Sequence, residues 1–211
     1  MSLPITHLLY LHGFRSSPQS KKARMTAAWM RVYRPDIVWC CPQLPPSPRA
    51  AMALVMAILN GNDSRNGNAD DPANAPWPEG RFAVIGSSLG GFYATALAQL
   101  TGCRAVLLNP AVHPARDLER YIGEISAWHS DERLHFDAIF IDELRLIAPV
   151  LLTQLTRYFT VIAKGDEVLD WREMRARYAG CAIKLLDEDH DHALSDYAKH
   201  LPDITDFLGL S

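Results

Sequence analysis

Gly86-Ser87-Ser88-Leu89-Gly90 is the sequence feature that most restricts the fold, because it joins an apolar run to an alanine-rich segment. The run at residues 82–85 predicts a buried strand, and the segment up to residue 100 predicts a helix. A serine in such a strand–turn–helix connection has a strained backbone, so the residues two before and two after it must be small. Gly86 and Gly90 satisfy this requirement for Ser88. The sequence therefore predicts an exposed serine side chain where a buried strand ends.

Short apolar runs alternate with helix-forming segments along the rest of the chain. Strands are predicted at residues 7–11, 37–41, 82–85, 105–108, 158–163 and 182–186, and helices at 20–33, 47–59, 88–100, 171–178 and about 193–207, the last with a break at Pro202. This alternation predicts an α/β fold with a mostly parallel sheet covered by helices on both faces. Ligands of such sheets gather at the carboxyl ends of the strands.

The length of 211 residues suits one domain, so residues 1–211 are predicted to form a single unit. Two segments interrupt the alternation. Residues 60–80 are rich in Asn, Asp, Gly and Pro, which predicts a flexible surface insertion. Residues 113–147 have mixed periodicity and no obvious strand, which predicts a small helical, cap-like excursion above the sheet.

The composition excludes several classes of protein. With 48% apolar and 21% charged residues, the chain is not disordered, collagen-like or a coiled coil. A net charge of −3 provides no positive electrostatic field that would attract nucleic acid or an anionic membrane. The four cysteines form no C-x-x-C pair, which predicts reduced thiols. No secretory signal or membrane-spanning run is found, so we expect a soluble, cytoplasmic protein whose oligomeric state stays open.

A serine becomes a good nucleophile only beside a base that an acid orients. The acid is expected after the strand at 158–163, where Asp166 comes first beyond the turn and is our choice. Asp170 is placed to cap the following helix, and Glu167 would face solvent. Asp137 and Asp142 are weaker candidates within the excursion.

The loop after the last strand, residues 187–192, contains two histidines that compete for the role of base. Its late position beside the final helix favours His192 over His190. Two alternatives stay open: a divalent-metal site formed by the H-x-H pair among four carboxylates, and a solvated acidic loop without a role.

Acyl transfer also needs two backbone N–H donors for the developing oxyanion. In the strand–turn–helix arrangement one donor belongs to the residue after the nucleophile, here Leu89, and the other to the loop after the first strand. We expect the second donor to be the N–H of Phe14. Gly13 would permit close approach of the backbone, and the ring of His12 would hold the loop in place.

Taken together these motifs resemble an α/β-hydrolase, and more narrowly the small bacterial YqiA-like esterase family. The blocks that carry the resemblance follow the family's order, at residues 10–18, 86–94, 108–112, 165–170, 192–194 and 207–210. The resemblance implies a serine esterase with Ser88 as nucleophile, Asp166 as acid and His192 as base. The chain departs from the family pattern in having Asp189-His190-Asp191 where that pattern has small glycines. The segment at 60–80 is also longer, and the usual antiparallel first strands are missing.

We therefore expect a hydrolase of small carboxylic esters or thioesters that forms an acyl-enzyme on Ser88. Its partner is a small-molecule substrate, and no cofactor, metal, nucleic acid or membrane is expected. Two alternatives remain: an acyltransferase with the same triad, and a non-catalytic hydrolase-fold protein that binds a ligand or partner.

Overall fold

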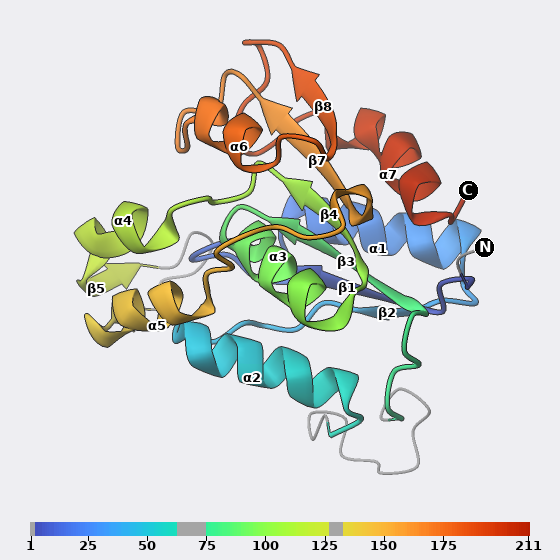
Figure 1. Cartoon of the computed structure of the whole chain (residues 1–211), viewed down its shortest axis with the longest axis horizontal. Helices are drawn as coiled ribbons and strands as arrows, with labels where there is room; N and C mark the ends of the chain where they lie inside the picture. The colour runs from blue at the N-terminus through green and yellow to red at the C-terminus, as the bar shows by residue number, and fades with distance from the viewer. Residues whose placement is uncertain (1–2, 63–74, 127–132) are drawn as a thin grey trace.

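The computed structural model describes residues 3–62, 75–126 and 133–211 of the chain (Figure 1). Its strands are β1 (His7–Leu11), β2 (Val38–Cys40), β3 (Phe82–Ser87), β4 (Arg104–Leu108), β5 (Gly123–Ser126), β6 (Arg133–Phe136), β7 (Tyr158–Ala163) and β8 (Ala182–Leu186). Its α-helices are α1 (Lys21–Tyr33), α2 (Pro48–Leu59), α3 (Leu89–Thr101), α4 (Pro114–Leu118), α5 (Ile139–Ile147), α6 (Trp171–Arg177) and α7 (Leu201–Leu208). Short 3₁₀ helices are η3 (Glu119–Tyr121), η4 (Leu155–Arg157) and η5 (Tyr197–His200).

Six strands form one parallel sheet in the order β2-β1-β3-β4-β7-β8. The predicted α/β fold class is confirmed. From β1 the chain moves outward to β2 at the edge, returns to β3 on the other side of β1, and then continues outward to β8. The direction of winding therefore reverses between β1 and β3. At such a switch point the loops after two adjacent strands open a crevice at the carboxyl edge of the sheet.

The two faces of the sheet bury separate apolar clusters, as expected for strands covered on both sides. Leu9 and Leu11 of β1 pack with residues of α2 and α3, whereas Leu8 and Tyr10 pack with residues of α1 and α7. The helices accordingly lie on opposite sides of the sheet in Figure 1. Packing in these two clusters fixes the positions of the strand ends, and therefore also where the loops after the strands begin.

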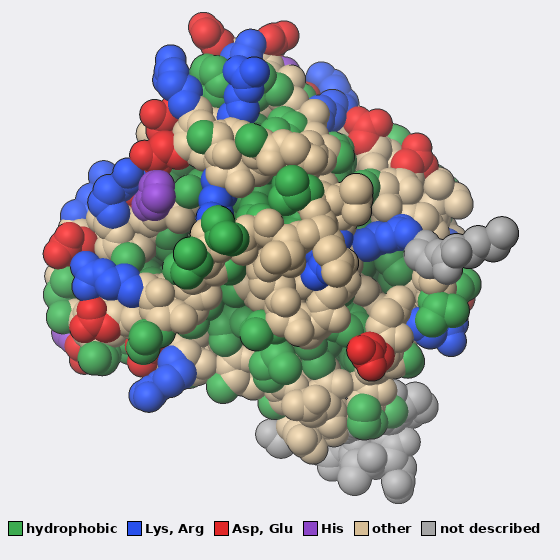
Figure 2. All heavy atoms as spheres, in the orientation of Figure 1, with side chains coloured by type: hydrophobic (Ala, Val, Ile, Leu, Met, Phe, Trp, Pro, Cys, Tyr) green, Lys and Arg blue, Asp and Glu red, His purple; other side chains and the backbone are tan. Residues whose placement is uncertain are grey.

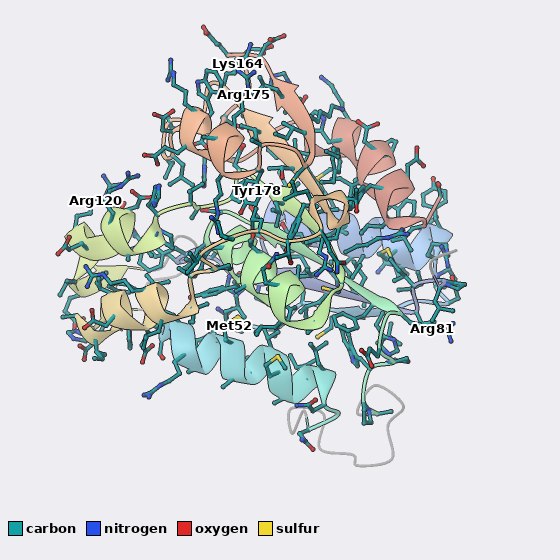
Figure 3. The ribbon with its side chains drawn as sticks, in the orientation of Figure 1. Met52, Arg81, Arg120, Lys164, Arg175 and Tyr178 are labelled. Carbon is teal, nitrogen blue, oxygen red and sulfur yellow. The ribbon has the colours of Figure 1, made fainter. Side chains whose placement is uncertain are left out.

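Polar contacts fix individual helices on this core. The Ser47 hydroxyl accepts the N–H of Ala50 and caps α2, and Pro48 occupies its first turn, as the sequence predicts. Beyond α6, the Tyr178 hydroxyl lies 2.8 Å from the Thr95 hydroxyl of α3, and both groups are buried (Figure 3). This contact ties the end of α6 to the helix that follows Ser88.

The segment at 113–147 contains helices α4 and α5, and also a feature that the sequence pattern did not reveal. Strands β5 and β6 pair antiparallel as a separate two-stranded sheet. Each has only four residues, which is too short for a clear alternation of polar and apolar positions.

The final helix begins later than predicted. Residues 193–196 are loop and turn, η5 follows, and α7 starts at Leu201. Pro202 lies in the first turn of α7, where its missing N–H costs nothing, so it starts this helix and does not break one.

Most of the predicted insertion at 60–80 lies outside the described residues. Where the description resumes, the Trp77 side chain is buried and its backbone N–H donates to Leu59 O at 2.8 Å. The Trp77 ring also lies 4.7 Å from the His7 ring, measured between centroids. The chain is thus held against the sheet before β3 begins.

None of the described helices is both long enough and apolar enough to cross a membrane. On the face drawn in Figure 2, acidic and basic side chains are interspersed around the outline.

Candidate active site

Ser88 occupies the sharp connection between β3 and α3. Its φ of 56° and ψ of −121° are unusual for a residue other than glycine. A Cβ at Gly86 would lie 2.2 Å from Gly90 O, and one at Gly90 would lie 2.0 Å from Leu11 O. Main-chain atoms of neighbouring segments touch at both positions, so any side chain larger than that of glycine would overlap them. The turn presents the Ser88 side chain at the carboxyl edge of the sheet, beside the end of β1.

Ser88, His192 and Asp166 form a continuous chain of hydrogen bonds. Ser88 Oγ lies 3.1 Å from His192 Nε2, and His192 Nδ1 lies 2.7 Å from Asp166 Oδ2. Because an ionised carboxylate only accepts, the proton is assigned to Nδ1. Nε2 is then free to accept the Ser88 proton. The side chain of His192 is 18% exposed and that of Asp166 is fully covered.

The Asp166 carboxylate is held in place by the turn that carries it. Its Oδ1 accepts the backbone N–H groups of Val168 and Leu169, each at 2.8 Å. Its other oxygen is thereby aimed at His192. These hydrogen bonds fix the orientation of the carboxylate.

The neighbouring acids have different contacts. Asp170 Oδ1 accepts the N–H of Arg172 at 2.9 Å and caps α6, as the sequence predicts. Glu167 is exposed, but it also accepts the backbone N–H of His192 at 3.0 Å, so it does more than face solvent. Asp137 accepts the N–H of Ile139, and Asp142 pairs with Arg145 within α5.

The structure brings His192, not His190, to Ser88. His190 makes its contacts with Asp189 and Asp196 instead. The loop that carries both histidines packs closely on the turn before Asp166: a Cβ at Gly165 would lie 2.2 Å from Glu188 O and 2.7 Å from His190 O. A glycine at 165 is what permits the two loops to meet.

Asn109 is a site residue that the sequence reasoning missed. It follows β4, is buried, and has a positive φ of 42°. Its Nδ2 donates to Asp191 O at 3.2 Å and to His192 O at 3.1 Å, and its Oδ1 accepts the N–H of Ala163 at 2.8 Å. Asn109 therefore fixes the main chain at His192 to the ends of two strands. An asparagine directly before Pro110 at a strand end is the only signal in the sequence.

Two lysines of α1 also hold the histidine loop. Lys22 Nζ donates to Ala193 O at 2.7 Å, and Lys21 Nζ donates to Ser195 O at 2.9 Å. Burial lowers the pKa of Lys22 to about 8, against the opposing influence of the Asp191 and Asp166 charges. Lys22 therefore lies close enough to Asp191 and Asp166 for its charge to interact with both carboxylates.

The loop after β1 lies directly against the serine. A Cβ at Gly13 would lie 3.2 Å from Ser88 Cβ. His12 Nε2 accepts the N–H of Leu44 at 3.0 Å, and Nδ1 lies 3.0 Å from Gly13 O, so the ring ties this loop as expected. Burial lowers the pKa of His12 and favours the neutral ring that accepts this bond.

The expected oxyanion donors are the N–H groups of Phe14, which follows Gly13 in this loop, and of Leu89, which follows Ser88 and begins α3. Among the described residues, neither N–H is used in a backbone hydrogen bond of a turn, loop or cap. The Phe14 ring packs on Tyr121 and Phe136, with centroids 5.4 Å and 5.3 Å away. The segment at 113–147 thus borders the site through aromatic side chains.

Among the described residues, His190, Asp196 and His200 lie close enough together to hold a metal ion, and Ser88, Asp166 and His192 are not part of this group.

Comparisons with known proteins agree with this architecture. The model of the family described as "Uncharacterised protein family (UPF0227)" matches residues 7–209. A UPF0227 protein from Shewanella loihica is 24% identical over 200 residues, covering 95% of this chain and 97% of the relative.

The fold also matches solved structures. An inferred hydrolase from Agrobacterium vitis S4 has a TM-score of 0.73 and 15% identity, covering 98% of this chain and 91% of that one. Est1E from Butyrivibrio proteoclasticus with bound ferulic acid has a TM-score of 0.64 and 12% identity, covering 97% and 87%. At these identities the likeness establishes the α/β-hydrolase fold.

Proposed function

The chain belongs to the UPF0227 family and has the α/β-hydrolase fold, and on that basis we propose that it is a serine esterase. Its substrates are small carboxylic esters or thioesters, and it acts through an acyl-enzyme on Ser88. The hydrogen-bonded chain from Ser88 through His192 to Asp166, at a strained turn, is the observation that carries the proposal. Est1E, the structural neighbour with bound ferulic acid, supports it at the level of fold.

In the first half of the reaction Ser88 Oγ attacks the carbonyl carbon of the ester, and His192 Nε2 takes the hydroxyl proton. The negative charge on the carbonyl oxygen is stabilised by the N–H groups of Phe14 and Leu89. His192 then returns the proton to the leaving oxygen or sulfur. An alcohol or thiol departs, and the acyl group stays on Ser88.

In the second half a water molecule attacks the acyl-enzyme while His192 takes one of its protons. Collapse of the intermediate releases the carboxylic acid, and the proton passes to Ser88 Oγ. Asp166 stabilises the imidazolium that forms in each half and holds its orientation. The bonds of Asn109 and Lys22 to the histidine loop keep Nε2 within reach of Ser88.

A fluorophosphonate probe and a panel of p-nitrophenyl esters and acyl thioesters of graded chain length test the proposal. Wild type should be labelled at Ser88 and should release acid, and Ser88→Ala should lose both. Ser87→Ala is the matched control because it removes a hydroxyl one residue away and should retain most activity. Labelling without turnover would identify a ligand-binding protein, and ester formation with added alcohol in place of acid release would identify an acyltransferase.

The cytoplasmic location stays a prediction, which fractionation of cells and detection of the protein would check.

A further inference from the structure

A second cluster of side chains, which the proposed reaction does not use, lies between the loop that carries His192 and η5. His190 comes from the loop after β8, Asp196 directly precedes η5, and His200 ends η5. His200 Nε2 lies 3.2 Å from Asp196 Oδ1, and His190 Nε2 lies 3.3 Å from Asp196 Oδ2. One nitrogen from each ring and a carboxylate oxygen all lie within 4.8 Å of one another.

Both nitrogen–oxygen distances are longer than those of charge-assisted hydrogen bonds, which are about 2.7–2.9 Å. The contact between His200 and Asp196 is a hydrogen bond of ordinary length, and both distances also match the spacing of two ligands around one metal ion. Bonds of about 2.0–2.1 Å to Zn²⁺ in a tetrahedral arrangement separate neighbouring ligand atoms by about 3.3 Å. Each nitrogen-to-oxygen distance is close to that separation, and the three ligand atoms lie within 4.8 Å of one another, so small side-chain movements would bring them around one ion.

The two rings are also poorly satisfied by the protein. The side chain of His200 is 4% exposed and that of His190 is 22% exposed. The Nδ1 atoms of both rings are buried and have no hydrogen-bond partner in the described part of the chain. Asp189 Oδ1 lies 2.8 Å from His190 Nδ1, although the direction is not that of a hydrogen bond. Each ring therefore turns its Nε2 toward Asp196, and this is the nitrogen available as a ligand beside the carboxylate.

We propose that His190, Asp196 and His200 bind one Zn²⁺ or a similar divalent transition-metal ion. Two imidazoles and a carboxylate suit such an ion better than Mg²⁺ or Ca²⁺, which prefer oxygen ligands alone. Nε2 of each histidine supplies a lone pair, so each ring carries its proton on Nδ1. The exposed Asp189 carboxylate can turn to accept that proton from His190, which is the usual support of a ligating histidine. Water fills the remaining position.

The site is a structural one, since neither Ser88 nor His192 belongs to it. It joins the loop that carries His192 to η5, which leads directly into α7. Lys199 Nζ lies 3.5 Å from Asp196 Oδ2, but its side chain is 77% exposed and can move into solvent when an ion binds.

Titration of metal-free protein with Co²⁺, followed by visible absorption and by metal content after gel filtration, tests the proposal. Wild type should bind one equivalent with a tetrahedral Co²⁺ spectrum, and Zn²⁺ should displace it. His190→Ala and Asp196→Asn should each weaken binding by at least about 100-fold, since losing a residue that only hydrogen-bonds to a ligand already costs about 10–100-fold. His200→Ala should weaken Co²⁺ binding to the same extent. If loss of this buried ring prevents folding, His190→Ala and Asp196→Asn still test the proposal.

His135→Ala is the matched control, because His135 also contacts a carboxylate, that of Glu124, but is exposed. It should bind Co²⁺ as wild type does, and so should His192→Ala. Binding that disappears in His192→Ala and persists in His190→Ala would place the ion at the triad and overturn the proposal. Absence of a bound equivalent in wild type would overturn it as well. Ser88→Ala should keep the ion, so failure of the esterase proposal and failure of this one are separable.

Discussion

The side-chain amide of Asn109 donates a hydrogen bond to the main-chain oxygen of His192, across 83 positions of sequence. Its second hydrogen bond reaches Asp191 O, and its oxygen accepts from β7. The position of the proposed base is therefore set by a residue that takes no part in proton transfer. Asn109 is a positioning residue.

Asn109→Gly should lower kcat/KM by about 10–100-fold, because small displacements of a catalytic group have effects of that size. Glycine tolerates the positive φ at this position, so the variant removes the amide and leaves the backbone unstrained. Steady-state kinetics on an ester that wild type cleaves provide the measurement. Asn60→Gly, at the exposed end of α2, is the control and should keep wild-type kinetics. Unchanged kinetics in Asn109→Gly would contradict the positioning role.

Asp166→Asn should lower kcat by about 10⁴-fold, the size of effect seen when a triad histidine is left in the wrong tautomer. The amide oxygen can still accept from Val168 and Leu169, but the NH₂ group facing His192 Nδ1 can only donate. The histidine proton then moves to Nε2, which can no longer accept from Ser88.

Asp170→Ala is the matched change for this test. It removes the cap of α6 and should lower the free energy of unfolding by about 1 kcal/mol with kcat nearly unchanged. Kinetics and urea denaturation of both variants give the comparison. If Asp170→Ala were the inactive enzyme and Asp166→Asn an active one, the assigned acid would be wrong.

His192→Ala should abolish both ester hydrolysis and fluorophosphonate labelling of Ser88, because no other described side chain accepts a hydrogen bond from Ser88 Oγ. His190→Ala should retain most of each activity, since its ring contacts only Asp189 and Asp196 among the charged groups nearby. Mass spectrometry of the labelled peptide, with turnover measured in parallel, distinguishes the two. An inactive His190→Ala beside an active His192→Ala would reverse the assignment.

The lowered pKa of Lys22 predicts how the free energy of unfolding changes with pH. Its pKa is about 8 in the folded protein and about 10.4 in an unfolded chain, so between these values the unfolded state binds more protons. Stability contributed by this group therefore increases as pH rises from about 8 to about 10. Lys22→Met lacks this contribution.

Urea denaturation at pH 7, 8, 9 and 10 should show wild type gaining stability relative to Lys22→Met in that window. Lys21→Met, which alters the exposed neighbour on α1, should follow wild type. Parallel stability curves for wild type and Lys22→Met would refute the lowered pKa.

The parts of the fold that follow from local patterns were predictable. Continuous apolar runs identified all six strands of the main sheet, and the glycines around Ser88 identified the turn, since each signal lies within a few residues. The choice of Asp166 and His192 used chain order and resemblance, and the structure places both side chains in hydrogen-bonding contact with their expected partners.

The contacts that could not be predicted join distant segments. Asn109 and Lys22 reach the histidine loop from 83 and 171 positions away, and nothing in their own neighbourhood marks those contacts. Likewise, the cluster of His190, Asp196 and His200 exists only because the loop after β8 turns back over η5. The H-x-H pair suggested a metal site with His192, whereas the fold separates the two histidines of that pair.

The glycines of the Ser88 turn restrict which amino acids this turn can contain, whereas the segment at 113–147 lies outside that restriction. Main-chain atoms of β1, β3 and α3 touch directly at Gly86 and Gly90, so any side chain added there would displace the nucleophile. The aromatic residues that border the site come from the segment at 113–147, which has its own small sheet and shares no strand with the main one. In the proposed esterase, changes in that segment can alter which acyl or leaving group fits while the contacts among Ser88, His192 and Asp166 stay the same. Substrate preference can then evolve separately from the proposed chemistry of bond cleavage.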